Sequence, residues 1–169
     1  IKISWDSVDG AEKYEIYRKS NANDNWNLYV TTYETEFVDK DIVTGTSYLY
    51  SLKTVGQDVT SNMSTTVSVA RVIAPESLDF DYTDEGIKIS WSKVPVAQGY
   101  NIYRKSRAEN KWQLVGSTGS AVTDYNDSSA EGGYYTYGVT ATLEKSESVM
   151  TTKDKEIYFL GSPKNLVVK

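Results

Sequence analysis

The heptapeptide "YEIYRKS", Tyr14–Ser20, returns as "YNIYRKS", Tyr100–Ser106, 86 positions later. The same spacing separates "IKISW" at Ile1–Trp5 from its second copy at Ile87–Trp91. Further matches follow in the same order, and their spacing grows to 87 and then 88 positions toward the end of each copy. Self-similarity at a fixed period is the signature of structural units repeated along a chain. The chain is therefore predicted to be a tandem of two related modules.

Within each copy, apolar and polar residues alternate. Ile87, Ile89 and Trp91 occupy one phase, whereas Lys88 and Ser90 occupy the other. This period of two is typical of a strand with one buried face. Runs rich in Gly, Asn and Asp separate the strand patterns, and no window shows a sustained helical period. Several short strands in a unit of about 90 residues predict an all-β sandwich.

The composition excludes several classes of function. The 169 residues contain no Cys and no His, which removes disulfides, thiolate chemistry, imidazole bases and the usual zinc ligands. A net charge of −5 argues against nucleic acid or an anionic membrane as the main partner. No apolar run is long enough to cross a bilayer, so no membrane insertion is expected. The first residues already follow a strand pattern, with no signal peptide, and we expect the chain to be an excised part of a larger protein.

These features resemble the fibronectin type III module, in the form common in large bacterial surface and secreted proteins. Trp5 and Trp91 close strand B of each copy, and the repeated heptapeptide lies in strand C. Tyr48 and Tyr135 match the tyrosine corner of the family, at the start of strand F. An immunoglobulin domain would instead favour Cys in strands B and F. The resemblance implies two fibronectin type III-like (immunoglobulin-like) β-sandwiches in tandem, each with its Trp in the core.

The resemblance also implies domain bounds. Residues 1–74 form a module that lacks its strand A, residues 75–161 form a complete module, and residues 162–169 form strand A of a following module. The boundary is expected between Val72 and Ser77, because proline cannot donate a hydrogen bond to a sheet and holds the preceding residue extended.

The final segment, "SPKNLVVK", carries an expectation about partners. Leu166 follows Pro163 as Leu78 follows Pro75, so Leu166 should be the core anchor of a strand A. A first module without strand A should present an open sheet edge. Either the segment inserts there as a strand donated by another copy of the chain, or it is the trimmed start of a third module. In a parent protein, the module's own strand A would make the same contact.

Trp26 and Trp112 are candidate binding residues, because exposed indole rings stack on sugars. Each is followed two positions later by an apolar residue, Leu28 or Leu114, as in a strand that packs on the core. Their occurrence at equivalent positions in both copies also suits a structural task. The packed reading is therefore favoured over glycan stacking.

Tyr17 and Tyr103 are the other binding candidates. They lie on the opposite phase from Ile16 and Ile102 and should face outward. Together with the neighbouring Arg residues, at positions 18 and 104, they could form a flat recognition face. Isolated exposed tyrosines are common, so this face is the weaker of the two interpretations.

The sequence marks no catalytic, metal or cofactor site. Two carboxylates suffice for glycoside hydrolysis, and 23 acidic residues are present, but none recurs in a strained or Gly-rich context. The loop Asn21–Asn25 lacks the spaced carboxylates of a calcium loop. No enzyme activity, no metal and no cofactor are therefore expected.

Two functions remain open. The modules could be non-catalytic structural spacers of a larger extracellular protein, attached to a bacterial surface or secreted, with neighbouring modules of the same polypeptide as their partners. Alternatively, they could be adhesion or binding modules that recognise a protein or polysaccharide through loops or the outer face of strands C, F and G. The repeated positions are chiefly core positions, while the loops differ between copies, which favours the structural role.

Overall fold

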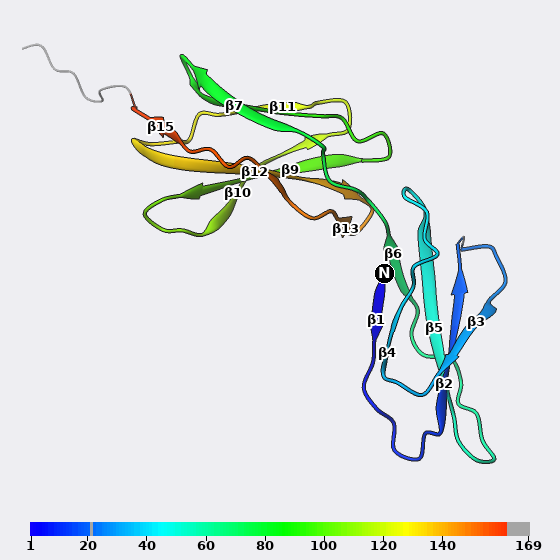
Figure 1. Cartoon of the computed structure of the whole chain (residues 1–169). Coiled ribbons are helices and arrows are strands. Elements are labelled where there is room, and N and C mark those ends of the chain that lie inside the picture. The colour runs from blue at the N-terminus through cyan, green and yellow to red at the C-terminus, as the bar shows by residue number, and fades with distance from the viewer. Residues whose placement is uncertain (21, 162–169) are drawn as a thin grey trace, which may run out of the picture. The chain divides into compact units, whose positions relative to one another are not determined.

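The computed structural model describes residues 1–20 and 22–161, and this part of the chain contains only strands and connecting turns (Figure 1). Two compact units divide the chain between Arg71 and Val72. Each unit consists of two antiparallel sheets, which confirms the predicted all-β class. The segment 162–169, predicted as a strand A with Leu166 as its anchor, lies outside the described residues.

Unit 1 has a two-stranded sheet and a four-stranded sheet (Figure 1). The small sheet pairs β1 (Lys2–Ser4) with β4 (Glu36–Val38). The larger sheet has the order β3-β2-β5-β6. Its strands are β2 (Lys13–Lys19), β3 (Asn27–Thr32), β5 (Ser47–Val55) and β6 (Val67–Ala70).

Unit 2 has a three-stranded sheet of order β11-β8-β7, formed by β7 (Leu78–Thr83), β8 (Gly86–Trp91) and β11 (Asp124–Asp127). In the second sheet, β10 and β9 lead to the long strand β12, against which three short strands pair. The strands of this sheet are β9 (Gly99–Ser106), β10 (Trp112–Gly119), β12 (Gly133–Leu143), β13 (Ser146–Glu147), β14 (Thr151–Thr152) and β15 (Ile157–Phe159).

The repeated heptapeptide forms the central strands β2 and β9, and its first Tyr links core to loop in both units. The rings of Tyr14 and Tyr100 are buried. The Tyr14 hydroxyl accepts a hydrogen bond from the backbone N–H of Val8 (2.9 Å), and that of Tyr100 from Val94 (2.8 Å). Each ring thus fills the core while its hydroxyl fixes the loop that precedes the strand.

The two tryptophans of strand B differ in burial. The Trp91 ring packs on Tyr100 with ring centroids 5.3 Å apart, and Trp91 is buried. The Trp5 ring packs on Tyr14 at 5.4 Å but is only half-buried. A central core position is therefore confirmed for Trp91, whereas Trp5 packs against the core of unit 1 as predicted but is not fully buried. The difference arises because β7 covers this region in unit 2, and the described part of unit 1 contains no counterpart of β7.

The tyrosine corner forms completely in unit 1 only. The Tyr48 hydroxyl accepts a hydrogen bond from the backbone N–H of Val43, at 3.0 Å. Tyr135 is equally buried, but no backbone group in residues 1–20 and 22–161 bonds its hydroxyl. Tyr48 follows Asp39 by 9 positions, whereas Tyr135 follows Asp127 by 8. The shorter connection in unit 2 changes the geometry of the corner.

Tyr48→Phe is expected to lower the free energy of unfolding of unit 1 by about 1 kcal/mol, because it removes the acceptor of the Val43 N–H and keeps the ring. Tyr135→Phe is the matched control and should change the stability of unit 2 by less than about half of that amount. Urea titrations of the two variants and the wild type measure both values. Equal losses of unfolding free energy in the two units would contradict the finding that only the Tyr48 hydroxyl accepts a backbone hydrogen bond.

Candidate functional site

The four candidate residues lie on one side of the larger sheets. In β2 and β9, Tyr17 and Tyr103 alternate with fully buried isoleucines and so face away from the core, as predicted. Each Trp ring lies against a lysine that stands two positions after the tyrosine and so faces the same side of the sheet. The Lys19 Nζ lies 4.9 Å from the centroid of the Trp26 ring, and the Lys105 Nζ lies 5.2 Å from that of Trp112. We call this side the outer face; it comprises Tyr17, Lys19, Trp26 and Leu28 in unit 1, and Tyr103, Lys105, Trp112 and Leu114 in unit 2.

The expected inward packing of the third strand is wrong in both units. Leu28 is 52% exposed and Leu114 is 57% exposed. The rings of Trp26 and Trp112 are half-buried, each beneath a lysine rather than in the core. The tryptophans are therefore surface residues that a ligand can partly reach.

A β-bulge explains this outcome. Leu28 pairs with Tyr17, but the next pair joins Val30 to Ile16, so Tyr29 is an extra residue in β3. Because the bulge shifts the phase by one, Val30 reaches the core while Leu28 faces outward. A second bulge lies at the equivalent position of β10 in unit 2.

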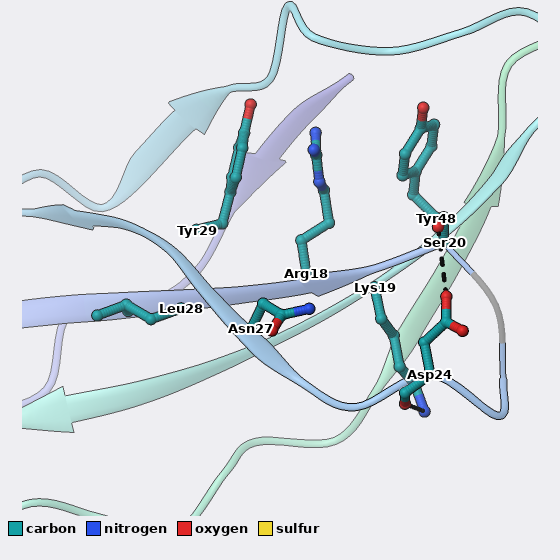
Figure 2. A pocket seen from close by; sticks show the side chains of 8 residues that line it. All are labelled: Arg18, Lys19, Ser20, Asp24, Asn27, Leu28, Tyr29 and Tyr48. Atoms are coloured by element: carbon teal, nitrogen blue, oxygen red, sulfur yellow. Dashed lines mark hydrogen bonds between the residues drawn. The ribbon is translucent and has the colours of Figure 1, made fainter.

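Unit 1 has a small hollow of about 210 Å³ beside the β2–β3 hairpin (Figure 2). In Figure 2 the Arg18 side chain stands between the rings of Tyr29 and Tyr48, whose centroids lie 3.8 and 5.1 Å from the guanidinium carbon. Trp26 is not part of the wall. The lining consists of Arg18, Lys19, Ser20, Asp24, Asn27, Leu28, Tyr29 and Tyr48.

Unit 2 has a larger hollow, of about 680 Å³, and Trp112 lines it. Two of its lysines approach aromatic rings: Lys105 lies against Trp112, and the Lys155 Nζ is 5.5 Å from the ring centroid of Phe80. The lining, called the Trp112 hollow below, consists of Lys105, Trp112, Thr136, Thr152, Lys153, Asp154, Lys155 and Glu156.

Two of the charges in the Trp112 hollow are already paired. Lys153 contacts Asp79 at 2.8 Å, and Glu156 pairs with Arg107. The remaining lysines, at 105 and 155, outnumber the remaining carboxylate, that of Asp154. The hollow thus combines a half-exposed indole, two hydroxyls and a small local excess of positive charge on a chain whose net charge is −5.

Tyr103 belongs to a cluster centred on Glu147. The Glu147 Oε1 atom accepts hydrogen bonds from the Tyr103 hydroxyl (2.7 Å), the Asn101 amide (3.1 Å) and the Thr140 hydroxyl (2.5 Å). Burial acts to raise the pKa of Glu147, but these three donors outweigh it and hold the pKa below its ordinary value. Tyr17 similarly donates to Glu15, at 2.8 Å. Both outer-face tyrosines are therefore engaged within their own units.

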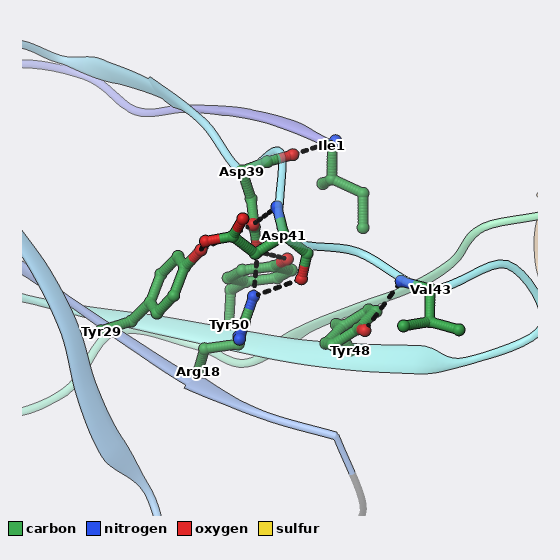
Figure 3. A network of polar contacts seen from close by, with 8 residues as sticks. All are labelled: Ile1, Arg18, Tyr29, Asp39, Asp41, Val43, Tyr48 and Tyr50. Carbon is green, nitrogen blue, oxygen red and sulfur yellow. Dashed lines mark hydrogen bonds and ion pairs between the residues drawn. The ribbon is translucent and has the colours of Figure 1, made fainter.

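The expectation that Arg18 and Arg104 extend the outer face is wrong. The Arg18 Nη1 atom lies 2.7 Å from Asp39 Oδ2, on the inward side of the sheet (Figure 3). The same oxygen accepts a hydrogen bond from the Tyr50 hydroxyl at 2.6 Å. Asp39 Oδ1 accepts hydrogen bonds from the Tyr29 hydroxyl (2.8 Å) and the Asp41 backbone N–H (2.9 Å). The Asp39 carboxylate has no exposed surface, and both of its oxygens accept hydrogen bonds.

The hydrogen bonds determine how this network titrates. Burial acts to raise the pKa of Asp39, but hydrogen bonds from Tyr50, Arg18 and Tyr29 outweigh it, so the pKa lies below its ordinary value. Burial, and hydrogen bonds to Asp39 and Asp41, raise the pKa of Tyr29 to about 12. The carboxyl therefore stays ionised, and the phenol stays neutral, across the physiological range.

Unit 2 repeats the same network around Asp127. Its Oδ2 atom lies 2.8 Å from Arg104 Nη1 and 2.9 Å from the Tyr137 hydroxyl. Its Oδ1 atom accepts from the hydroxyl and the backbone N–H of Ser129, at 2.7 and 3.1 Å. Asp127 and Asp39 are both completely buried. An arginine, an aspartate and a tyrosine from three different strands or turns thus form a shared framework, which we call the Arg–Asp–Tyr framework.

Two chicken proteins resemble the chain in structure. A two-domain fibronectin type III segment of chicken tenascin covers 94% of this chain and 91% of its own, with a TM-score of 0.49 and 17% identity. The FN1–FN3 domains of chicken CNTN1, a contactin, cover 95% of this chain with a TM-score of 0.50 and 17% identity, and the chain spans 62% of that structure. Each unit has a fibronectin type III-like fold. No protein-family model and no curated protein matches the sequence.

Two kinds of feature are absent from residues 1–20 and 22–161 of the fibronectin type III-like units, a cluster of metal ligands and a membrane-spanning helix. No group of three or more carboxylates, His or Cys in this part of the chain is placed to hold a metal ion. The part that the structure describes also has no helix long and apolar enough to cross a membrane.

The framework aspartates were not found from the sequence, although a signal existed. Asp39 recurs as Asp127, 88 positions later, and the arginines and tyrosines of the framework recur at 86 and 87. Equivalent Asp, Arg and Tyr residues in two repeats indicate a shared polar contact. This contact was not predicted, because charged residues in a strand usually face water.

Proposed function

We propose that the two units are non-catalytic structural modules, spacers in a larger extracellular protein of the type that bacterial surface and secreted proteins carry in tandem. The observation that carries this proposal is the Arg–Asp–Tyr framework. The aspartates and tyrosines of this framework are buried and hydrogen-bonded in both units, whereas the hollows of the two units differ in size and lining. Modules whose role is structural need to conserve the contacts that hold their fold, whereas their surface residues can differ.

The state of the carboxylates supports a non-catalytic role. A general acid needs a raised pKa and access to substrate. The pKa of Asp39 is instead held below its ordinary value, and its oxygens are occupied by Arg18, Tyr29 and Tyr50. Glu147 is likewise occupied by three donors. These groups stabilise the sandwiches rather than transfer protons.

A second candidate function is binding of a carboxylated polysaccharide at the Trp112 hollow. Its support is the half-exposed indole of Trp112 beside Lys105 and Lys155, with Thr136 and Thr152 as hydroxyl partners. An aromatic ring offers a flat surface to the apolar face of a sugar, and lysines attract its carboxylate. Unit 1 carries an equivalent tryptophan outside its hollow, so the two units should differ in binding.

Retention on immobilised polygalacturonate, with neutral pullulan as the second matrix, separates the two functions. If the hollow binds, the intact chain is retained on polygalacturonate only, and Trp112→Ala weakens binding about tenfold because a stacked ring is lost. Trp26→Ala is the matched control and should keep full retention. Passage of the intact chain through both matrices would reject the binding function and leave the structural role. Equal retention of the wild type and Trp112→Ala would reject the Trp112 hollow as the site.

A further inference from the structure

Two tyrosine rings contact each other on the surface of unit 2. Tyr134 of β12 and Tyr158 of β15 stand directly opposite each other in the antiparallel pairing of these strands. The adjacent pair, Tyr135 and Ile157, is buried. Because successive residues of a strand point to opposite faces, Tyr134 and Tyr158 both turn away from the core. Their ring centroids lie 4.7 Å apart.

Neighbouring strands and turns hold both residues of this pair in position. The guanidinium carbon of Arg107 lies 3.8 Å from the centroid of the Tyr134 ring. Arg107 also pairs with Glu156, which stands two positions before Tyr158. On the other strand, the Tyr158 carbonyl accepts a hydrogen bond from the Tyr82 hydroxyl at 2.5 Å. The close approach of the two rings is therefore supported by contacts outside the pair itself.

Solvent reaches both rings. Tyr134 is 42% exposed and Tyr158 is 46% exposed. The pair Tyr48 and Tyr50 in unit 1 differs, because its ring centroids lie 6.5 Å apart and both of its residues are buried. Among the tyrosine ring pairs of residues 1–20 and 22–161, the pair in unit 2 alone combines close contact with access from solvent.

Two accessible phenols in contact favour one covalent reaction, which is oxidative coupling. A one-electron oxidant removes one electron and one proton from each phenol and leaves two phenoxyl radicals. The radicals join through one ring carbon next to the hydroxyl-bearing carbon on each side. The hydrogens on these two carbons then move to the oxygens and restore both phenols. Rings that are already held together react within one chain, because proximity replaces a bimolecular encounter.

We propose that Tyr134 and Tyr158 form a site of oxidative cross-linking, at which a peroxidase and hydrogen peroxide join the two rings by a carbon–carbon bond. The two phenols together lose two electrons and two protons, and hydrogen peroxide takes them up to give two molecules of water. The bond closes a loop between residues 24 positions apart and ties β15 to β12. A chain without cysteine thereby acquires the kind of restraint on its unfolded state that a disulfide gives.

The test treats the 169-residue chain with a heme peroxidase and hydrogen peroxide at low protein concentration and maps the tryptic peptides by mass spectrometry. Trypsin places Tyr82, Tyr134 and Tyr158 in three different peptides, because lysines lie between them. The expected product joins the Tyr134 and Tyr158 peptides, has lost two hydrogen atoms and shows dityrosine fluorescence. Tyr134→Phe and Tyr158→Phe should each abolish it, because phenylalanine forms no phenoxyl radical. Tyr33→Phe is the matched control, since Tyr33 is 79% exposed, and should leave the product unchanged.

The cross-link should also change the stability of one unit only. The urea midpoint of unit 2 should rise after oxidation, because the new bond restrains its unfolded state, whereas that of unit 1 should not rise. Exchange at amides assigned to each unit separates the two midpoints. Tyr158→Phe, treated with the same oxidant, corrects for oxidation of other side chains and should show no rise in either unit.

Four results would overturn the proposal. The first is a treated chain without coupled tyrosines, although free tyrosine couples in a parallel reaction. The second is a product that joins Tyr82 to Tyr158. The third is a product that joins only separate copies of the chain at every protein concentration. The fourth is a product that survives Tyr158→Phe.

Discussion

Trp91→Ala is expected to lower the free energy of unfolding of unit 2 by about 3–5 kcal/mol, a large part of the stability of a domain of this size. The Trp91 ring is buried against Tyr100, and its strand pairs with β7, where Leu78 lies opposite Trp91. Its indole N–H is buried without an acceptor among the described residues. The ring contributes to stability by packing, and its removal opens a cavity in the core.

Trp5→Ala is the matched control for this prediction. Trp5 packs on Tyr14 at nearly the same ring separation, 5.4 Å against 5.3 Å, but it is half-buried, so its loss should cost clearly less. Urea unfolding, followed by exchange at amides assigned to each unit, gives the two stabilities separately. A Trp91→Ala variant within about 1 kcal/mol of the wild type would show that the core of unit 2 does not depend on this ring.

Asp39→Ala is expected to cost unit 1 about 3 kcal/mol, because removal of one partner of a buried ion pair leaves the other without compensation. The Arg18 guanidinium would lose its carboxylate, and the buried Tyr50 hydroxyl would lose its acceptor. The partial exposure of Arg18 keeps the cost at the lower end of the range for buried pairs. Asp41→Asn is the control, since the Asp41 side chain accepts one exposed hydrogen bond, from Tyr29.

Acid should remove the contribution of Asp39. Its folded-state pKa is lowered, so the stabilisation is fully present above the unfolded pKa of about 3.9 and is lost as pH falls through the folded value. The difference in unfolding free energy between wild type and Asp39→Asn should therefore be constant from pH 7 to about pH 5 and shrink below about pH 4. A difference that stays constant down to pH 2 would show that the charge of Asp39 is not what stabilises unit 1.

The sequence predicted the fold because its strongest signals are local. Alternation around Trp91 and Ile102 gives the phase of two strands directly, and both residues are buried as expected. The same rule failed at Leu28. A single extra residue in the pairing of β3 with β2 reverses which side chains reach the core, and a bulge leaves no mark in the alternation itself.

The candidate site was less predictable because it depends on contacts between distant segments. Arg18 was placed on the recognition face because it neighbours Tyr17, yet its partner Asp39 lies 21 positions away and the pair forms only when the two sheets stack. Tyr135 shows a different limit. Its ring is buried as predicted, but one residue fewer in the preceding connection changes the reach of its hydroxyl. Local patterns do not encode such distances.

Tyrosine hydroxyls connect the loops and sheets of both units, through Val8, Val43 and Val94 and through the two framework aspartates. The chain has no cysteine, so none of these connections is covalent. A unit pulled open by tension on the polypeptide would break only contacts that re-form spontaneously. Recovery after stretching would then need neither an oxidant nor a disulfide isomerase, and would follow as fast as the strands find their register.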